Sequence, residues 1–424
     1  MRLVFVSNYF NHHQKPLCEA LSRAEDVDFV FYQTQDMDEE RQRMGWGIDI
    51  SAYPYVKRYR DNEEAAKRDI FESDLVIWGG VEMEEVIEPR LQAGKLTFRY
   101  SERIYKEGQW KFVSPRGLKK KYHDHIRYRK SPVYLLCAGA YVGSDFKLIH
   151  AYPKKKFVWG YFPEVKHYDL DELMAKKSRE GEPVRILWAG RMIDWKHPEY
   201  ALEAAHRLLC GGGGLKPEVV QRLKANGGFV LTMAGDGELG QTMLAQAREK
   251  GLQEHVRFTG YLSPEQIREE MERADIFLFT SDRKEGWGAV LNEAMNSGCL
   301  VIARYMIGAV PYLIQHGWNG MVADGDLDRF CSMVLYMTLE RGDCREQGKR
   351  AYETMVRYWN AENAAAQFLR VAEGLMKGME SGKGNKKALL PEFAPEEEKT
   401  GALQPMCRDP EIRESRGLRF TKRW

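Results

Sequence analysis

The 424-residue sequence predicts an α/β protein with two doubly wound domains, each a parallel sheet covered by helices on both faces. Three observations lead to this prediction. The chain is too long for one core of ordinary size, which favours two domains. Short β-branched or aromatic runs alternate with amphipathic segments, as in parallel sheets. Prolines and a charge-rich run at 154–183 interrupt both periodicities, so we place the domain boundary near residue 165.

The alternation gives two series of strands and helices. The expected strands are 2–7, 27–34, 73–80 and 96–101 in the first series, and 184–190, 229–235, 256–260, 276–281 and 300–304 in the second. Helical spacing is clearest at 198–209, 264–274 and 289–298. Ligands of such folds bind at the carboxyl ends of the strands. Loops near 190, 236, 261 and 285, which follow strands of the second series, therefore form the candidate site.

Composition excludes several classes of protein. With 64 Lys+Arg against 62 Asp+Glu the net charge is +2, which gives no overall bias toward nucleic acid. No stretch approaches the ~18 apolar residues of a membrane-spanning helix, and the amino terminus lacks a signal-peptide pattern. The seven cysteines are scattered, with no C-x-x-C pair, which argues against a disulfide framework or a zinc site. We therefore expect a cytoplasmic protein with reduced thiols.

Two carboxylates stand out in the stretch KEGWGAVLNEAMNSGCLVIA, residues 284–303, which joins an expected strand to an expected helix. The amides of Gly286 to Val290 would be unpaired donors at the helix amino terminus, where an anion or polarised hydroxyls are favoured. Glu285 lies at the mouth of this space, and Glu293, in the second helical turn, leans back toward it. This arrangement suits a sugar or ribose. Glutamates and turn glycines at this spacing also occur without any function, so the argument depends on the whole succession of elements.

A pair of cations stands out in AGRMIDWKHPE, from Ala189. Arg191 follows a strand end, and Lys196 closes the loop before Pro198, which suits a helix start. Together a guanidinium and an ammonium neutralise a diphosphate, the first through paired hydrogen bonds and the second as a point charge. Taken alone, either residue is equally consistent with a solvated surface position.

Together these motifs resemble the retaining, nucleotide-sugar-dependent glycosyltransferases of family 4, which have the GT-B fold: two Rossmann-like domains with the active site in the cleft between them. The matching segments are 190–198, 233–239, 258–267, 285–303 and 308–322, within a region of resemblance at about 184–378. The organisation we expect is an acceptor-binding domain at 1–165, a nucleotide-sugar-binding domain at 166–360, a helix at 361–379 that crosses back to the first domain, and a polar tail at 380–424.

The resemblance also implies roles for single residues. Glu285 matches a glutamate that contacts hydroxyls of the donor sugar, and Glu293 one that holds the nucleotide ribose. Arg191 and Lys196 match the pair on the donor diphosphate, so that Arg191, Lys196 and Glu285 are the candidate catalytic residues. The other expected donor contacts are Gly190, Gly260, Tyr261, Gly286, Trp287, Gly288, Ala289 and Val290.

The implied reaction moves a hexosyl unit from a nucleoside-diphosphate sugar, such as a UDP-sugar, to a glycan or lipid-linked acceptor in cell-surface or extracellular polysaccharide biosynthesis. The resemblance implies retention of configuration and no metal or further cofactor. Fixed positive charge would stabilise the leaving diphosphate, and neither glutamate need be a covalent nucleophile. Two Asp-x-Asp sequences, Asp36 with Asp38 and Asp324 with Asp326, imitate a metal-binding pattern but read better as solvated turns.

The acceptor side is harder to recognise. Many family members carry a Gly-Gly pair in the first loop, whereas this chain has SNYFNHHQKP at 7–16, which leaves Asn8, His12 and His13 as candidates. The segment 106–130 holds nine Lys or Arg against two acids, interleaved with aromatic residues. It is a candidate for peripheral contact with an anionic membrane at its inner face, with a plain solvated loop as the alternative. The near-neutral chain argues against nucleic acid.

Two other functions stay open. The first is a sugar-nucleotide epimerase of the same architecture, which would act on the sugar without an acceptor. The second is a catalytically silent protein that binds a sugar nucleotide or a glycan. The presence of both the cation pair and the glutamate pair favours a transferase over the silent protein.

Overall fold

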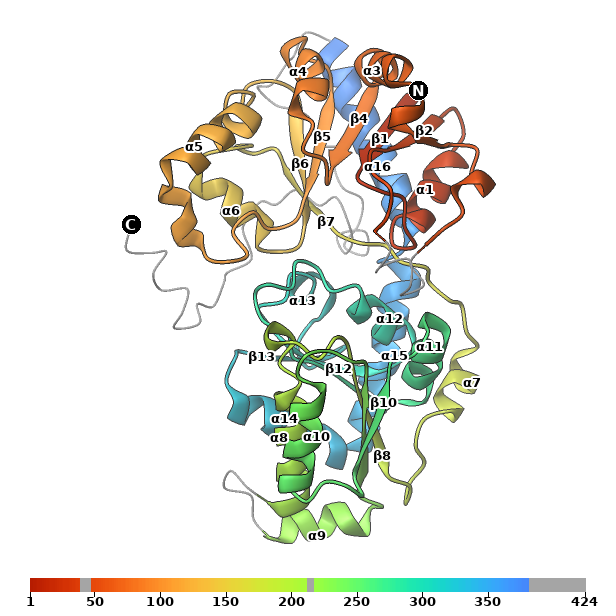
Figure 1. The fold of residues 1–424 in the computed structure, drawn as a ribbon. Coiled ribbons are helices and arrows are strands. Elements are labelled where there is room, and N and C mark those ends of the chain that lie inside the picture. Colours follow the sequence, from red (N-terminus) through yellow and green to blue (C-terminus); the bar gives the residue numbers. More distant parts are fainter. Residues whose placement is uncertain (39–46, 212–216, 381–424) are drawn as a thin grey trace. The chain divides into compact units, whose positions relative to one another are not determined.

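A computed structural model describes residues 1–38, 47–211 and 217–380, which form two compact units (Figure 1). Unit 1 comprises residues 1–164 and, of the later residues described, 358–380. Unit 2 is the continuous stretch 165–357. The chain thus leaves unit 1 once and returns to it. The expected polar tail at 380–424 lies, apart from Glu380, outside the described residues.

Unit 1 contains a seven-stranded parallel sheet of order β3-β2-β1-β4-β5-β6-β7. Its strands are β1 (Arg2–Ser7), β2 (Asp28–Gln33), β3 (Val56–Arg58), β4 (Leu75–Gly79), β5 (Thr97–Ser101), β6 (Val133–Ala138) and β7 (Lys156–Trp159). The four strands expected from the sequence are confirmed. Strands β3, β6 and β7 were not expected, and β7, within the segment 154–183, pairs with β6 as an edge strand.

Helices cover both faces of this sheet, as the alternation of apolar residues predicts. They are α1 (Lys15–Ser22), α3 (Glu63–Glu72), α4 (Glu84–Gln92), α5 (Pro115–Lys121), α6 (Val142–Leu148) and α16 (Ala361–Glu380). Val4 and Val6 belong to one core with Ile70 of α3 and Ile87 of α4. Helix α16 lies beside α1 (Figure 1). Its Phe368 contacts Phe98 of β5 with ring centroids 4.9 Å apart. The late helix therefore completes the core of unit 1.

Unit 2 contains a six-stranded parallel sheet of order β10-β9-β8-β11-β12-β13. Its strands are β8 (Val184–Ala189), β9 (Phe229–Ala234), β10 (Val256–Gly260), β11 (Ile276–Phe279), β12 (Leu300–Arg304) and β13 (Met321–Ala323). All five strands expected here are confirmed, and the short β13 is an addition. Counted within the unit the order is 3-2-1-4-5-6, as in Rossmann folds, and unit 1 repeats it with a seventh strand.

The helices of unit 2 pack their apolar stripes on this sheet. They are α7 (Leu170–Ala175), α8 (Glu199–Cys210), α9 (Pro217–Ala225), α10 (Gly240–Glu249), α11 (Pro264–Arg273), α12 (Val290–Asn296), α13 (Val310–Leu313), α14 (Leu327–Leu339) and α15 (Arg341–Arg357). On α8, Leu202, Ala205 and Leu208 are buried at helical spacing against Trp188 and Leu231. Ser263 begins α11 with a capping box to Gln266, which fixes the end of the loop after β10.

Two expectations drawn from composition can be compared with the structure. Of the six cysteines in the described residues, five are buried and only Cys210 is exposed, so most behave as small core residues. Within the residues described, no helix combines the length and the apolar character needed to cross a bilayer.

Candidate functional site

The strand order of unit 2 reverses between β8 and β11, which are neighbours in the sheet but not in the chain. In open parallel sheets the loops on either side of such a reversal diverge, and ligands bind in the crevice at the carboxyl ends of the strands. The loop after β8 holds Gly190 to His197, and the loop after β11 holds Thr280 to Ala289. Arg191, Lys196, Glu285 and the other candidates of unit 2 apart from Gly260 and Tyr261 therefore follow the two strands that flank the reversal.

Lys196 and Glu285 meet across this reversal. The Lys196 ammonium forms an ion pair with Oε2 of Glu285, and the Ser281 hydroxyl donates to the same oxygen at 3.0 Å. The Lys196 and Glu285 side chains are only 16% and 12% exposed, so the charges interact in a medium of lower dielectric than water. The ammonium also lies 4.7 Å from the ring centroid of Trp195. The structure thus pairs two residues to which the sequence assigned separate contacts.

The backbone around this pair is held by buried polar groups that the sequence reading missed. The Thr280 hydroxyl donates to the Lys196 carbonyl at 2.6 Å and accepts from the indole of Trp188 at 2.8 Å. The Asp282 amide donates to the Trp195 carbonyl at 2.9 Å, and the buried Arg304 donates to the Thr280 carbonyl at 3.1 Å. These bonds hold Lys196 at a fixed position in front of β11. In the sequence, Thr280 is marked only by its position as a polar residue directly after a strand.

Close backbone contacts tie the loops after β8, β9 and β10 together. Gly190 donates to the Ala234 carbonyl at 3.0 Å, and Gly235 donates to the Gly260 carbonyl at 2.8 Å. A Cβ at Gly235 would lie 1.9 Å from the Gly190 carbonyl oxygen, so only glycine fits there. Gly190 and Gly260 are thereby brought to one edge of the sheet. Tyr261, the next residue, is 58% exposed at this edge.

Glu293 lies one residue nearer to the helix start than expected. Helix α12 begins at Val290 rather than Ala289, so Glu293 lies in its first turn and not in its second. Its side chain is partly buried and, among the described residues, makes no hydrogen bond or ion pair. Burial raises the pKa of Glu293, although the positive charges of Arg268 and Lys166 oppose the shift. A desolvated carboxylate of this kind gains from a ligand that brings hydroxyl donors.

Arg191 and Trp287 differ in their availability to a ligand. Arg191 is exposed, and its guanidinium has no hydrogen-bond or ion-pair partner within the described part of the chain. Trp287 is buried, its indole donates to Asn292 at 2.9 Å, and its carbonyl accepts from Ala309 at 3.2 Å. The ring of Trp287 is therefore part of the core, and only the Trp287 backbone is available to a bound nucleotide sugar. Gly288 has φ 90°, and a Cβ there would lie 2.4 Å from the ring of Phe279.

His197 is a charged group that sequence reasoning did not single out. It adopts a left-handed conformation with φ 50°, its Nδ1 lies 2.7 Å from Glu199, and its Nε2 lies 3.7 Å from Asp282. Burial alone would lower the pKa of His197, but the neighbouring carboxylates of Asp282 and Glu199 outweigh it and raise the pKa to about 9. Below that pH, the imidazolium adds a positive charge immediately after Lys196 and fixes Asp282 at the base of the second loop.

The second Asp-x-Asp sequence has structural partners. Asp324 pairs with Arg329, and Asp326 accepts a hydrogen bond from the amide of Asp328 at the start of α14. In the first, Asp36 lies 3.8 Å from Arg58. Among the residues that the structure describes, no group of three or more His, Cys, Asp or Glu side chains has the geometry to hold a metal ion.

Unit 1 carries a second group of candidates at its own reversal, after β1. Asn8 accepts from the Ser7 hydroxyl at 3.2 Å. The rings of His12 and His13 lie 3.8 Å apart, and His13 stacks on Tyr161 at 5.8 Å. Burial lowers the pKa of His12, and burial with the neighbouring His12 lowers that of His13 to about 3. Both imidazoles are therefore neutral at pH 7, a state in which one ring nitrogen of each can accept a hydrogen bond from a hydroxyl.

The chain is similar to known proteins both in sequence and in fold. Residues 169–354 match the family described as glycosyl transferases group 1. Over 207 residues, 46% of this chain and 50% of the relative, it is 27% identical to the GDP-mannose-dependent alpha-(1-6)-phosphatidylinositol monomannoside mannosyltransferase of Mycobacterium tuberculosis. It is 29% identical over 168 residues, 38% of each chain, to the amylovoran biosynthesis glycosyltransferase AmsK of Erwinia amylovora. The matched regions thus span half or less of these relatives.

Two solved structures resemble most of the chain. HepE of Anabaena, crystallised in complex with UDP, has a TM-score of 0.61 at 14% identity, over 88% of this chain and 100% of that one. The lipopolysaccharide outer core galactosyltransferase WaaB has a TM-score of 0.60 at 17% identity, over 88% and 99%. At these identities the likeness concerns the fold, and it confirms the expected GT-B fold with two Rossmann-like units.

Proposed function

We propose that this chain, whose residues 169–354 match the glycosyl transferases group 1, transfers a hexosyl unit from a nucleoside-diphosphate sugar to an acceptor hydroxyl. The observation that carries the proposal is the arrangement at the strand reversal of unit 2. There the partly buried ion pair of Lys196 and Glu285 lies on the two flanking loops, and Glu293 keeps a carboxylate without protein donors. Charge for a diphosphate and acceptors for hydroxyls are thus supplied by neighbouring loops.

The proposed roles follow from the chemistry of the bond that breaks. The bond from the anomeric carbon to the phosphate oxygen breaks, its electron pair leaves with the diphosphate, and the acceptor oxygen forms the new bond to carbon. Lys196 and the unpartnered Arg191 would bind the diphosphate and stabilise its growing negative charge. Glu285 would accept from sugar hydroxyls, and Glu293 from the ribose. With two cations for the leaving group, the proposed reaction requires no metal ion.

We further propose that configuration at the anomeric carbon is retained. The acceptor hydroxyl would approach on the face that the diphosphate leaves, and its proton would pass to the departing phosphate oxygen. No protein nucleophile is needed in this scheme, and the ion pair that holds Glu285 lowers its availability for covalent attack. A two-step displacement would instead need a free carboxylate beneath the anomeric carbon.

The acceptor that we propose is a glycan or a lipid-linked sugar in cell-surface or extracellular polysaccharide biosynthesis. Two relatives support this class, since one is named as a mannosyltransferase acting on a phosphatidylinositol monomannoside and the other as an amylovoran biosynthesis enzyme. In unit 1, the neutral His12 and His13 beside Asn8 are the acceptor-side candidates.

Thermal stabilisation by a panel of nucleotides tests the proposal. UDP and UDP-glucose come first because HepE structures hold them, and GDP-mannose follows because the mannosyltransferase is named for it. A ligand at a hundredfold excess over its Kd stabilises the folded state by about 2.7 kcal/mol, or roughly 5–10 °C for a unit of this size. Loss of the shift in Glu293→Gln, but not in the distant variant Lys349→Met, would assign it to this site.

The products then separate the remaining functions. Transfer to an added sugar acceptor, or slow hydrolysis of the donor, supports the transferase. Epimerised donor without transfer would indicate the epimerase, and binding without any turnover across a panel of acceptors would indicate a silent binding protein. A folded protein that none of the nucleotides stabilises contradicts the proposal.

A further inference from the structure

The basic segment 106–130 of unit 1 is folded rather than a plain loop. It forms the 3₁₀-helix η4 (Gln109–Val113), then α5, then the π-helix η5 (Tyr122–Ile126). Phe112, Leu118 and Ile126 pack against the core of unit 1. The segment therefore has an inner side that is fixed to the domain and an outer side that other residues occupy.

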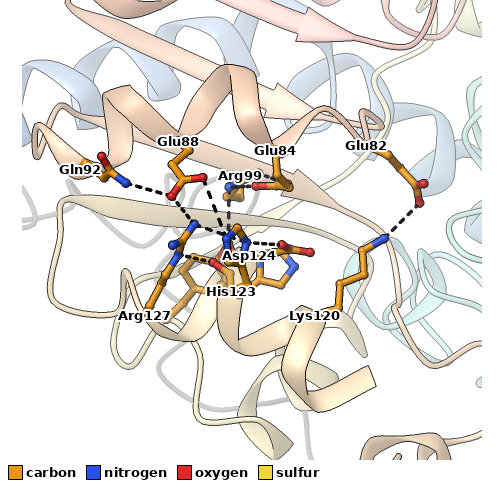
Figure 2. Close-up of polar contacts among 11 residues, drawn as sticks. Glu82, Glu84, Glu88, Gln92, Arg99, Lys120, His123, Asp124 and Arg127 are labelled. Carbon is orange, nitrogen blue, oxygen red and sulfur yellow. Dashed lines mark hydrogen bonds and ion pairs between the residues drawn. The ribbon is translucent and has the colours of Figure 1, made fainter. Parts of the chain in front are cut away.

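A hydrogen bond to Arg99 of β5 and an ion pair with Glu88 of α4 anchor the inner side (Figure 2). Arg99 donates to both carboxylate oxygens of Glu84 at 2.8 and 2.6 Å, and to the Asp124 carbonyl at 3.4 Å. Arg127 follows the last residue of η5, and its guanidinium forms an ion pair with Glu88 at 2.8 Å. The bidentate pair with Glu84 fixes Arg99, which in turn holds the Asp124 carbonyl of η5. The helices are thus presented in one fixed orientation.

The outer side exposes apolar and aromatic surface. Trp110 is 69% exposed, Val113 61% and Tyr122 59%. These are three of the eight large hydrophobic side chains that are exposed in the described residues, and all three lie within thirteen positions. Trp110 and Val113 share one side of η4, since positions i and i+3 of a 3₁₀-helix are aligned. Exposed apolar residues gathered in this way mark an interaction surface.

Cations are exposed on α5, which lies between η4 and η5 in the chain. Arg116, Lys119 and Lys120 are all exposed on α5, at positions i, i+3 and i+4 of one helical face. Among the described residues, the one acid that pairs with any of them is Glu82, 3.8 Å from Lys120 (Figure 2). Both partners of that pair are exposed, so it contributes little. We call Trp110, Val113, Arg116, Lys119, Lys120 and Tyr122 together the basic-aromatic face.

We infer that the basic-aromatic face docks unit 1 on a bilayer surface that contains anionic phospholipids. Lys and Arg would lie among the lipid phosphates, while Trp and Tyr suit the interfacial layer, where one end of the ring is apolar and the other is hydrated. Because the whole chain carries a net charge of only +2, the attraction is a local property of this face. The inference goes beyond sugar transfer, and its test needs no substrate, so its failure would leave the proposed function standing.

Vesicle binding by matched variants tests the inference. Sedimentation with vesicles of phosphatidylcholine and phosphatidylglycerol is compared for the wild type, for Arg116→Gln with Lys119→Gln and Lys120→Gln, and for a control triple. The control, Lys57→Gln with Arg60→Gln and Arg68→Gln, removes the same charge from exposed residues elsewhere in unit 1. Each Lys or Arg at an anionic surface strengthens vesicle binding roughly fivefold. The triple variant on α5 should therefore lower partitioning onto the vesicles on the order of 100-fold, and the control triple variant far less.

The apolar contribution has its own pair of variants. Trp110→Ala should lower partitioning on the order of 10-fold, whereas Trp318→Ala, which truncates an exposed Trp in unit 2, should leave it unchanged. Unaltered melting temperatures establish that each variant is folded. The inference would be overturned if the two triple variants lost vesicle binding equally, or if the wild type bound neutral and anionic vesicles equally. Binding to a single-stranded oligonucleotide but to no vesicle would overturn it in favour of nucleic acid.

Discussion

The ion pair of Lys196 and Glu285 should be measurable as a coupling energy in the ligand-free protein. At an effective dielectric constant of about 20, opposite charges in contact attract by roughly 4 kcal/mol, and desolvation removes part of this. Side-chain exposures of 16% and 12% place the pair between exposed pairs, worth about 0–1 kcal/mol, and buried pairs, whose breakage costs about 3–5. We therefore expect Lys196→Met or Glu285→Gln alone to destabilise unit 2 by about 2 kcal/mol.

A double-mutant cycle isolates this coupling. For a unit of this size, a loss of about 2 kcal/mol lowers Tm by roughly 4–8 °C. Once the first partner is gone, the second substitution should cost little, so the double variant should resemble each single variant. Urea unfolding followed in unit 2 gives the free energies. The control is the exposed pair of Lys349 and Glu346 on α15, 2.7 Å apart, which should couple by about 0.3 kcal/mol.

Two results would refute this reasoning. Additive losses from Lys196→Met and Glu285→Gln would mean that the pair does not form in solution. A coupling no larger than that of the control pair would mean that the two side chains are as well solvated as surface residues. In either case the argument that Glu285 is held away from covalent attack would fall as well.

Three further predictions concern single residues. Because burial raises the pKa of Glu293, Glu293→Gln should raise the Tm of the ligand-free protein at pH 7, and this gain should vanish toward pH 4.5; a lower Tm at pH 7 would contradict it. The raised pKa of His197 stabilises the fold fully below pH 6.5 and not above about 9, so the deficit of His197→Asn should disappear over that window in pH-dependent melts. Arg191→Ala should lower kcat more than donor affinity; an effect on donor binding alone would make it a plain phosphate anchor.

Much of the architecture followed from the sequence because the buried strands are continuous apolar runs. All nine expected strands form, and Gly, Ser and Pro mark where the loops between strands and helices lie. Four strands were missed: Val133–Ala138 is a fully buried apolar run that should have been found, and the other three have weaker signals. Met321–Ala323 has three residues, and Lys156–Trp159 follows a run of lysines that reads as solvent-exposed until β6 supplies its pairing partner. Edge strands depend on their neighbours more than on their own pattern.

For the candidate site, the sequence identified the loops but not the contacts between side chains. Proximity to the strand reversal places Lys196 and Glu285 near each other, yet nothing in their spacing of 89 residues predicts that they pair. Thr280 and Arg304 look like ordinary strand-end residues, and their function in holding the Lys196 backbone depends on the order of β8, β11 and β12 in the sheet. The sequence also did not show that the Trp287 ring is buried in the core, so that the donor contact expected of Trp287 can come only from its backbone.

Unit 1 is built from two separate stretches of the chain, and this affects how it folds during synthesis. Unit 2 is encoded without interruption by 165–357, whereas unit 1 lacks part of its core until α16 is made. On the ribosome, the segment translated first is therefore completed last, in contrast to the usual order in which the amino-terminal domain folds first. Until Phe368 emerges, the sheet surface around Phe98 and Trp159 has no covering helix. While unit 2 is being translated, nascent unit 1 thus exposes an aggregation-prone apolar surface. Binding of a chaperone would protect unit 1 most during this period.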